Sequence, residues 1–532
     1  QVPCRFADLG SVARATMSIA GRGATSRVQQ GLVSFSDRLI QIGQRYMAEH
    51  TEGMIVLSAL VAFVVVWMVF WTISTAPLDV HIDNDEALIW AQHFAFGYKH
   101  PPMTGWLFAL WFAVFPHRQW AIDLLNVTNC AVALAVTWRL LRDHLDKNRA
   151  LLGIFALALI PLYEVKAEVL NANTVMMPFW AATLLFYLRA RRGLGSADAL
   201  LAGAFASLTM LGKYWAVFLF AGMTVAALVG PGTRRFWRSP APYLIAAGAA
   251  IVLAPHVWWL LHDRSSVAFA ESVVNYIPFS ETLQKSAYYI IGAVAYITVP
   301  LIFLAALRPN RAALADIVWA ADEDRRQAWV LLIVPLILPA LVNLAIPYRL
   351  TPDWTFPNWA ALPIVLYGSR HLLVDDRAVA RGGLAALVVT LAIVLASPIV
   401  ACVRLVNGPD VNRPHFRQVA ERAELLAGRP IELMWGSEGI VPGLPFYLPN
   451  AQRLIAGPLS AEGRAAIATH GLLIVCTSDD VPCQKTAESL ANAGAHTIIA
   501  TLTRRFLGVS SPPISYQITV VPPAQPSAPP TG

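Results

Sequence analysis

Residues 54–74 read MIVLSALVAFVVVWMVFWTIS, an apolar run without a charged side chain. A helix needs about 20 such residues to cross the hydrocarbon core of a bilayer. The whole chain has this character, because 56% of its 532 residues are hydrophobic, only 14% are charged and the mean hydropathy is +0.53. Soluble domains carry about 25% charged residues. The sequence therefore indicates a polytopic α-helical membrane protein.

Further apolar segments follow this run, and together they predict about 11 transmembrane helices. The other segments are residues 119–139, 150–166, 174–189, 197–211, 214–230, 241–261, 286–306, 328–346, 357–369 and 383–405. Residues 103–116 are also apolar but too short to cross the bilayer, so we interpret them as a re-entrant or interfacial helix.

The distribution of Lys and Arg predicts which loops face the cytoplasm, where these residues accumulate. With the N-terminus inside, the loops on the cytoplasmic side hold 23 Lys and Arg and the opposite loops hold 7. Counting 103–116 as a further span would reverse every later loop and destroy this bias. The net charge of +7 is thus explained by topology, and we expect no nucleic-acid partner.

The chain divides into a short arm and a membrane domain before its C-terminal part. Residues 1–53 lack the apolar core of a cleavable signal peptide, so they are predicted to form a cytoplasmic arm with a surface helix around 30–48. Residues 54–405 carry the membrane spans and a long periplasmic loop at 75–118. We expect a multi-pass protein of a bacterial inner membrane.

Residues 406–520 differ in kind, because polar helix-like stretches alternate there with short β-rich runs. This pattern predicts a small α/β domain on the periplasmic side. Its expected helices and strands are 415–427, 460–469 and 484–493, and 431–435, 472–476, 496–501 and 515–521. Cys476 and Cys483 form a disulfide in an oxidising compartment or remain two free thiols. The Pro-rich residues 521–532 are predicted to be disordered.

The first periplasmic loop contains DNDEALIWAQHFAFGYKHPP at residues 83–102. Asp83 and Glu86 fit the N-cap and N3 positions of a helix over residues 84–96. Asp85 is not required by that capping pattern. The loop is therefore predicted to be a folded element with a spare carboxylate at one end.

Other polar residues recur at the predicted periplasmic ends of the helices, where ionisable groups are costly and often functional. Tyr98, Lys99 and His100 precede a Pro-Pro pair, and Lys213 lies between two apolar segments. Lys213 has two interpretations, snorkelling to the lipid headgroups or presenting a fixed charge to a phosphate. The other members of this set are Asp79, His81, Glu164, Lys166, Glu168, Asn171, Asn173, Tyr214, His262, Asp263, Arg264, Arg349 and Asp353.

These motifs together resemble the C-type glycosyltransferases, which have the GT-C fold. The resemblance rests on the Asp-Glu loop ending in HPP and on three further stretches, LYEVKAEVLNANTVMMPFWAATLLFYLRA, LTMLGKYWAVFLF and HVWWLLHDRSSVAF. More narrowly, the sequence looks like the family-39-type bacterial enzymes, which include the lipid A aminoarabinose transferase and the rhizobial lipopolysaccharide galacturonosyltransferases. Each motif alone is weak, but together they cover roughly residues 54–405.

The resemblance implies a polyprenyl-phosphate-linked sugar as donor and a lipid or glycan acceptor in the cell envelope, with the chemistry on the periplasmic face. Asp85 matches the expected catalytic acid, which would act as general base, and Glu86 would support it. Lys213 matches the residue expected to hold the donor phosphate, and His100 with Lys99 matches the basic residue before Pro-Pro.

Tyr98, Asn173, Tyr214, His262 and Arg349, on the same predicted face, are further candidates for substrate binding. Many relatives have an acid at the position of Asn173, so a second catalytic carboxylate is in doubt there. Some relatives bind a divalent metal near the loop, but no ligand set is evident in this sequence, and metal dependence stays open.

Three other readings compete with this one. A lipid-linked sugar flippase would place ionisable groups near the bilayer midplane and often shows two inverted halves, whereas here the polar groups lie at one face. A scaffold would use residues 406–520 to bind a periplasmic partner. Within the enzyme class, a protein O-mannosyltransferase-like enzyme is the alternative, and the sequence identifies neither the sugar nor the acceptor.

Overall fold

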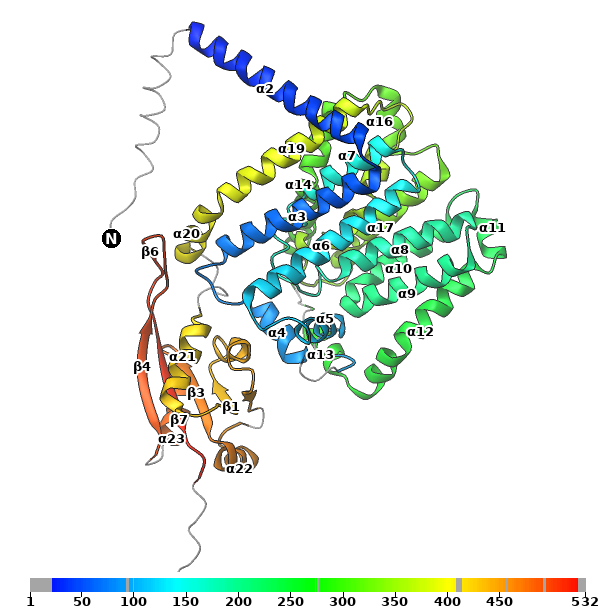
Figure 1. The fold of residues 1–532 in the computed structure, drawn as a ribbon. Coiled ribbons are helices and arrows are strands. Elements are labelled where there is room, and N and C mark those ends of the chain that lie inside the picture. Colours follow the sequence, from blue (N-terminus) through cyan, green and yellow to red (C-terminus); the bar gives the residue numbers. More distant parts are fainter. Residues whose placement is uncertain are drawn as a thin grey trace, which may run out of the picture.

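The structure is a computed structural model that describes residues 22–91, 95–98, 100–272, 274, 277–407, 414–454, 457–490 and 494–524 (Figure 1). Residues 22–33, 82, 85, 86 and 270 are described by their backbone alone. Parts of the predicted N-terminal arm and of the Pro-rich tail therefore lie outside the described residues. A helix bundle makes up most of the chain, and a sheet-containing region lies at one of its ends.

The bundle is built from α-helices and two 3-10 helices, η1 and η2. They are α2 (Arg22–Glu49), α3 (Glu52–Ser74), α4 (Ile82–Ala91), α5 (Met103–Phe112), α6 (Gln119–Arg142), α7 (Lys147–Ala158), α8 (Met176–Arg192), α9 (Ser196–Gly212), η1 (Tyr214–Ala216), α10 (Val217–Leu228), α11 (Thr233–Arg238), α12 (Ala241–His262), α13 (Ser265–Ser272), α14 (Phe279–Tyr296), α15 (Thr298–Ala306), α16 (Arg311–Val318), α17 (Glu323–Ala345), η2 (Pro352–Ala361), α18 (Leu362–Tyr367), α19 (Asp376–Leu395) and α20 (Ser397–Asn407).

Every predicted span coincides with helical structure, but the helices are less regular than their apolar runs suggest. Among the described residues, five helices are long and apolar enough to cross a membrane alone: α3, α6, α12, α17 and α19. The pair α14 and α15, bent by 47°, makes a sixth. The other predicted spans are shorter helices or begin in 3-10 geometry, as at η2. The number of membrane crossings therefore stays a prediction.

Large aromatic side chains fill the centre of the bundle, where Trp67, Trp180 and Trp359 are fully buried. Small residues set the crossing of α9 and α12. A Cβ added at Gly203 would lie 1.9 Å from the Ile245 carbonyl oxygen, and one at Gly248 would lie 2.1 Å from the Leu200 carbonyl oxygen. The two backbones thus approach closely through glycine, as is common where apolar helices pack in a membrane.

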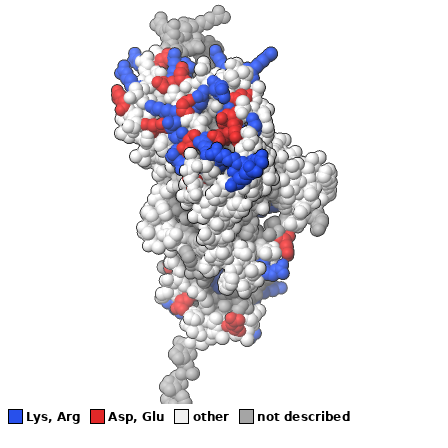
Figure 2. All heavy atoms as spheres, turned by 90° about the vertical axis from the view of Figure 1, so that its right-hand side faces the viewer, with Lys and Arg blue, Asp and Glu red and all other residues white. Residues whose placement is uncertain are grey.

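Charged side chains gather at one end of the molecule, above a wide belt of uncharged surface (Figure 2). The loops predicted to be cytoplasmic meet at one end of the bundle and are joined by ion pairs. The pairs are Arg142 with Glu52 at 2.5 Å, Arg189 with Asp143 at 2.6 Å and Arg192 with Asp324 at 2.7 Å. The first loop, with α4, α5 and α13, lies at the other end of the bundle (Figure 1), and the assignment of that end to the periplasm stays a prediction.

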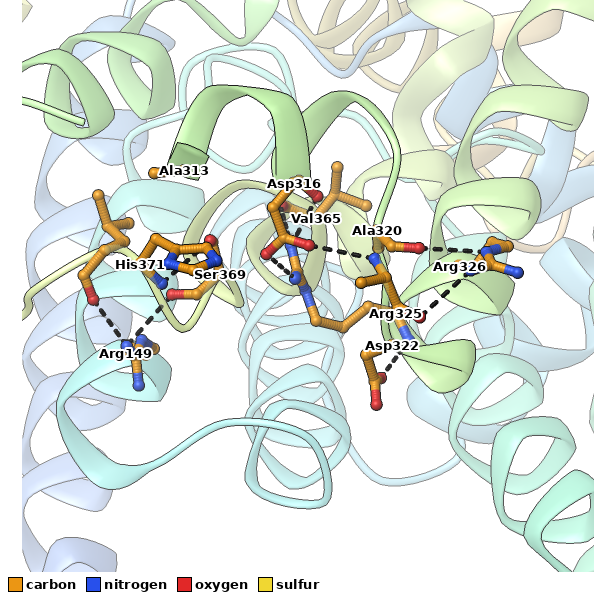
Figure 3. Close-up of polar contacts among 12 residues, drawn as sticks. Arg149, Ala313, Asp316, Ala320, Asp322, Arg325, Arg326, Val365, Ser369 and His371 are labelled. Atoms are coloured by element: carbon orange, nitrogen blue, oxygen red, sulfur yellow. Dashed lines mark hydrogen bonds and ion pairs between the residues drawn. The ribbon is translucent and has the colours of Figure 1, made fainter. Parts of the chain in front are cut away.

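A buried ion pair holds α16 against the start of α17 at the charged end (Figure 3). Arg325 Nη1 donates to Asp316 Oδ2 at 2.6 Å, and the two side chains are only 8% and 11% exposed. Burial raises the pKa of the Asp316 carboxyl, but hydrogen bonds from Ser369, the Ala321 amide and Arg325 outweigh it and hold the pKa at about 2. The pair is thus ionised throughout the physiological range.

We expect Arg325→Ala to destabilise the fold by about 3–5 kcal/mol, because it leaves a buried carboxylate without its counter-charge. Arg377→Ala is the matched control, since its ion pair with Asp37 is exposed and such pairs contribute about 0–1 kcal/mol. Thermal unfolding of both variants in detergent measures the difference. Equal shifts in melting temperature would show that the buried ion pair contributes no more to stability than the exposed one.

The C-terminal region is a five-stranded sheet with helices, as the alternating sequence pattern predicted. Strand order is β2-β1-β3-β7-β4, with β1 parallel to β2 and β3, and β7 antiparallel to β3 and β4. The elements are α21 (Phe416–Ala427), β1 (Leu433–Gly436), η4 (Val441–Phe446), β2 (Gln452–Arg453), α22 (Ala461–His470), β3 (Leu472–Thr477), α23 (Val481–Leu490), β4 (His496–Leu502), β5 (Arg505–Phe506), β6 (Val509–Ser510) and β7 (Ile514–Val521).

A disulfide joins Cys476 at the end of β3 to Cys483 in α23, with a Cα–Cα distance of 5.6 Å. Both residues are buried in a small apolar cluster behind the sheet. Of the two states that the sequence left open, a disulfide or two free thiols, the structure has the disulfide.

Candidate functional site

The first periplasmic loop folds into helix α4, but the helix begins earlier than predicted. Asp83 lies inside its first turn, and the Asp83 amide donates to the His81 ring at Nδ1 over 3.2 Å. The predicted capping role of Asp83 was therefore wrong, because the His81 ring takes that place. Its described part runs to Ala91, and residues 95–98 are not helical, so the helix does not reach residue 96 as predicted.

The predicted catalytic pair lies on α4. The backbones of Asp85 and Glu86 are in this helix, but their side chains lie outside the described residues. Asp83 next to them is partly buried, and its carboxylate accepts a hydrogen bond from Asn171 Nδ2 at 3.3 Å. The start of α4 thus faces the turn that precedes α8.

Lys213 sits where α9 ends and the chain becomes extended, with φ −161°. Its Nζ donates to Asn173 Oδ1 at 2.8 Å and lies 3.8 Å from the centre of the Trp354 ring. Asn173 belongs to the same turn as Asn171. Two residues that are 40 and 141 positions away from Lys213 in the sequence therefore contact its ammonium group.

The charge of Lys213 is strongly affected by its surroundings. Burial and the positive charge of Arg349 lower the pKa of its ammonium group, the negative charge of Asp83 opposes them, and the net result is a pKa of about 7. Among the described residues, neither Lys213 nor Arg349 forms an ion pair. Within the side chains that the structure describes, these two basic groups therefore act on each other without an ion-paired carboxylate, which is an arrangement suited to an anion.

The end of the first loop is fixed by α12 and α13. Tyr98 stacks on Trp90 of α4, and His100 packs edge-on against Phe269 with ring centres 5.1 Å apart. Gly97 lies against α12 so closely that a Cβ there would be 2.3 Å from the Trp259 ring. This segment is thus part of the folded site, while Lys99 lies outside the described residues.

The remaining predicted residues divide between neighbours of the site and residues away from it. The Tyr214 hydroxyl lies 3.0 Å from His256 Nε2, and His256 Nδ1 lies 2.7 Å from the Phe96 carbonyl oxygen. Tyr214 therefore supports the loop through His256, a residue the sequence reasoning missed. His262 is exposed, and its ring Nδ1 lies 2.8 Å from the Trp258 carbonyl oxygen of its own helix, so the structure gives it no contact with Lys213 among the described residues.

Trp354 was also missed, although its place in the aromatic and Pro-rich stretch PDWTFPNW, shortly after Arg349, was a usable signal. Its neighbour Asp353 binds Lys166 at 2.7 Å and the Tyr296 hydroxyl. These contacts hold the start of η2 in place. They therefore also hold the Trp354 ring against the Lys213 ammonium group. Among the described residues, no group of three or more His, Cys, Asp or Glu is placed to hold a metal.

The C-terminal region packs directly on α4. Val80, Ala87 and Leu88 share one apolar core with buried residues of α21, η4 and the sheet. Just before α4 begins, Asp79 Oδ2 accepts a hydrogen bond from Arg504 Nη2 at 2.7 Å, and both side chains are below 10% exposed. The helix that carries Asp85 is therefore held between the bundle and the C-terminal region.

Comparison with known proteins agrees with this architecture. Residues 99–259 match a family described as dolichyl-phosphate-mannose-protein mannosyltransferase. The lipid A galacturonosyltransferase RgtD of Rhizobium johnstonii is 25% identical over 293 residues, which cover 54% of this chain and 59% of that protein. The chain thus spans about three fifths of the length of this curated relative.

Two crystal structures of ArnT from Cupriavidus metallidurans are similar in fold, one bound to undecaprenyl phosphate and one in the apo state. Each superposes with a TM-score of 0.56 at 14% identity, covering 89% of this chain and 99% of ArnT. The resemblance that the sequence predicted is therefore confirmed: residues 99–259 match this mannosyltransferase family, and the chain has the GT-C fold of ArnT.

Proposed function

We propose that this protein is a membrane glycosyltransferase that moves a sugar from a polyprenyl-phosphate donor to a hydroxyl group of an envelope glycolipid. The observation that carries the proposal is the partly buried Lys213, which bonds Asn173 in the turn that contacts α4 and lies within the electrostatic influence of Arg349. The family match and the relative that acts on lipid A support the reaction class and the acceptor class.

The donor phosphate is assigned to the Lys213 end of the site. Asn173 supports this role because its amide oxygen orients the ammonium group without neutralising it. A carboxylate at that position would form an ion pair and compete with the phosphate. An amide at position 173, where many relatives have an acid, therefore leaves the positive charge of Lys213 available to bind the donor phosphate.

The reaction follows from this placement. Asp85 takes the proton of the acceptor hydroxyl as its oxygen attacks the anomeric carbon. The bond from that carbon to the phosphate oxygen breaks, and Lys213 with Arg349 stabilises the departing polyprenyl phosphate. A single displacement of this kind inverts the anomeric configuration. Tyr98 and the loop around it would shape the sugar subsite.

We place the reaction on the periplasmic face of the inner membrane. The loops on the Lys213 side hold 7 Lys and Arg against 23 on the other side, which is the bias that orients membrane proteins. The Cys476–Cys483 disulfide on the same side supports an oxidising compartment. A lipid carrier is the natural donor there, since nucleotide sugars are cytoplasmic.

Mass spectrometry of a deletion strain tests the proposal. Lipid A, core oligosaccharide and envelope glycoproteins are compared with the parent strain, and the expected result is loss of one sugar from a glycolipid. Loss from a glycoprotein would favour protein O-mannosyltransferase-like activity, which the family description suggests. Unchanged glycans, or unmodified lipid-linked sugar accumulating inside, would favour a scaffold or a flippase.

A further inference from the structure

A groove of about 430 Å³ lies between the turn that joins α5 to α6 and the C-terminal region. His117, Arg118 and Trp120 form one wall, and Arg417, Phe446 and Tyr447 belong to the other. This volume is in the range of small-molecule sites. The groove is separate from the Lys213 cluster, and none of the predicted site residues lines it.

One face of α21 supplies most of the opposite wall. Residues 417, 420, 421 and 424 line the groove at the spacing of a single helix face. Glu424 also lines a second hollow of about 300 Å³, which continues past Arg429 to Asn450. The two hollows form an elongated path along α21 and suit an extended ligand better than a compact one.

The lining chemistry is that of a sugar site with a place for phosphate. Burial lowers the pKa of His117, so the fixed cations are Arg118 and Arg417, with guanidinium groups that bind phosphate. Glu421 and Glu424 can accept hydrogen bonds from sugar hydroxyls. Trp120, Phe446 and Tyr447 offer ring faces and edges to the apolar side of a sugar.

The groove opens beside exposed apolar surface. Leu110 and Val114 at the end of α5 are 62% and 78% exposed, and Trp120 at the start of α6 is 44% exposed. Apolar side chains exposed at the end of a membrane helix, with an aromatic residue at the interface, mark the bilayer boundary. An extended head group in the groove would therefore keep its acyl chains in the membrane.

Groove residues also form hydrogen bonds with Asp79 and Val80, which lie just before α4 begins. The Tyr447 hydroxyl lies 3.3 Å from Asp79 Oδ1 and accepts the Val80 amide at 3.3 Å, and the Arg417 amide donates to Asp79 Oδ2. Asp79 lies six residues before Asp85 in the sequence. A ligand in the groove is thus held by the same residues that fix the helix bearing the proposed base.

We infer that this groove binds the phosphorylated sugar head group of the acceptor glycolipid, with Arg118 and Arg417 on its phosphate and α21 along its sugars. The inference rests on the proposed function and extends it by assigning the acceptor to a site of its own. Donor and acceptor then approach Asp85 from opposite sides, the donor from Lys213 and the acceptor from the C-terminal region.

The test measures lipid retention by native mass spectrometry of the full chain, which does not depend on turnover. The probes are lipid A and undecaprenyl phosphate, offered separately, with inorganic phosphate as competitor. We expect Arg118→Glu with Arg417→Glu to lower lipid A retention by at least about tenfold, since two charge-assisted contacts are reversed. Retention of undecaprenyl phosphate should not change.

Two further variants control for folding and for surface charge. Trp120→Ala alters one largely exposed side chain and should lower lipid A retention without changing the melting temperature. Arg422→Glu reverses a charge on α21 outside the groove and should leave lipid A bound as in the wild type.

The outcomes separate this inference from the proposed function. Unchanged lipid A retention in the groove variants, equal losses in Arg422→Glu, or displacement of lipid A by inorganic phosphate alone would overturn the groove assignment. Lys213→Ala should lose undecaprenyl phosphate and keep lipid A. If it keeps both lipids while the groove variants lose lipid A, the donor site is wrong and the acceptor groove stands.

Discussion

Asp85→Asn should lower the rate of sugar transfer by about 10²–10⁴-fold, the usual contribution of a positioned general base. The substitution keeps the size of the side chain and one oxygen, but an amide cannot accept the proton of the acceptor hydroxyl. The donor should still bind with near-normal affinity, because Lys213 and Arg349 lie on other segments of the site.

The measurement is transfer of radiolabelled sugar by the purified protein in nanodiscs, at equal expression and melting temperature. Glu86→Gln should give a smaller loss, because Glu86 is assigned only a supporting role. Asp263→Asn is the matched control, since this carboxylate lies at the same end of the bundle but is exposed and bonds the Ser265 amide. Retained activity in Asp85→Asn would remove it as the base.

Lys213→Ala should abolish donor binding, with a loss of at least about 10² in affinity for polyprenyl phosphate. The ammonium group is partly buried and hydrogen-bonded to Asn173 at 2.8 Å, so the substitution removes a positioned positive charge from the proposed phosphate site. Lys213→Arg should keep most of the affinity, because it retains the positive charge. Equilibrium binding of undecaprenyl phosphate to the protein in nanodiscs measures both variants.

The lowered pKa of Lys213, about 7 in the unliganded protein, also predicts a dependence on pH. Below pH 7 the group is charged and the donor binds well. As the pH rises through 7, the unliganded group loses its proton, so apparent donor affinity should fall. Lys213→Arg should remove this dependence, because arginine stays protonated throughout the range.

Stability should change in the opposite direction. Between pH 7 and the ordinary pKa of lysine, near 10.5, the unfolded chain binds a proton at Lys213 that the folded protein does not, so this group makes folding more favourable as the pH rises. Donor affinity that falls while the melting temperature holds or rises identifies Lys213 as the cause. A parallel fall of both would indicate general unfolding instead.

The helices of the bundle could be predicted because apolar runs in a bilayer have few alternatives to the helix, which satisfies every backbone group internally. The points at which these helices are interrupted could not be predicted from the sequence. The run at 150–166 stops being helical after Ala158, and the run at 383–405 is divided between α19 and α20. Such breaks depend on the segments that pack against the helix in the folded protein. The strand-containing region was predictable because residues such as 472–476 have a strong local β pattern.

The candidate site was only partly predictable for a similar reason. Lys213 was conspicuous, because a lysine between two apolar segments is costly. Asp83 was misread, because the His81 ring that caps α4 competes with it in a way that no local pattern reveals. Trp354 and His256 were missed, since their roles exist only where distant segments meet around Lys213 and the first loop.

The sequence by itself determined the class of protein, the approximate helices, the two sides of the bundle and the residues that carry charge at the proposed active face. These properties follow from local hydropathy and from the positions of Lys and Arg. Only the tertiary structure decided that Asn173, Arg349 and Trp354 meet at Lys213, and that Arg504 binds Asp79 across 425 residues of sequence. The physical reason is that a hydrogen bond or an ion pair is specified by distances in space, and an apolar pattern fixes which segments are helices without fixing which of their ends meet.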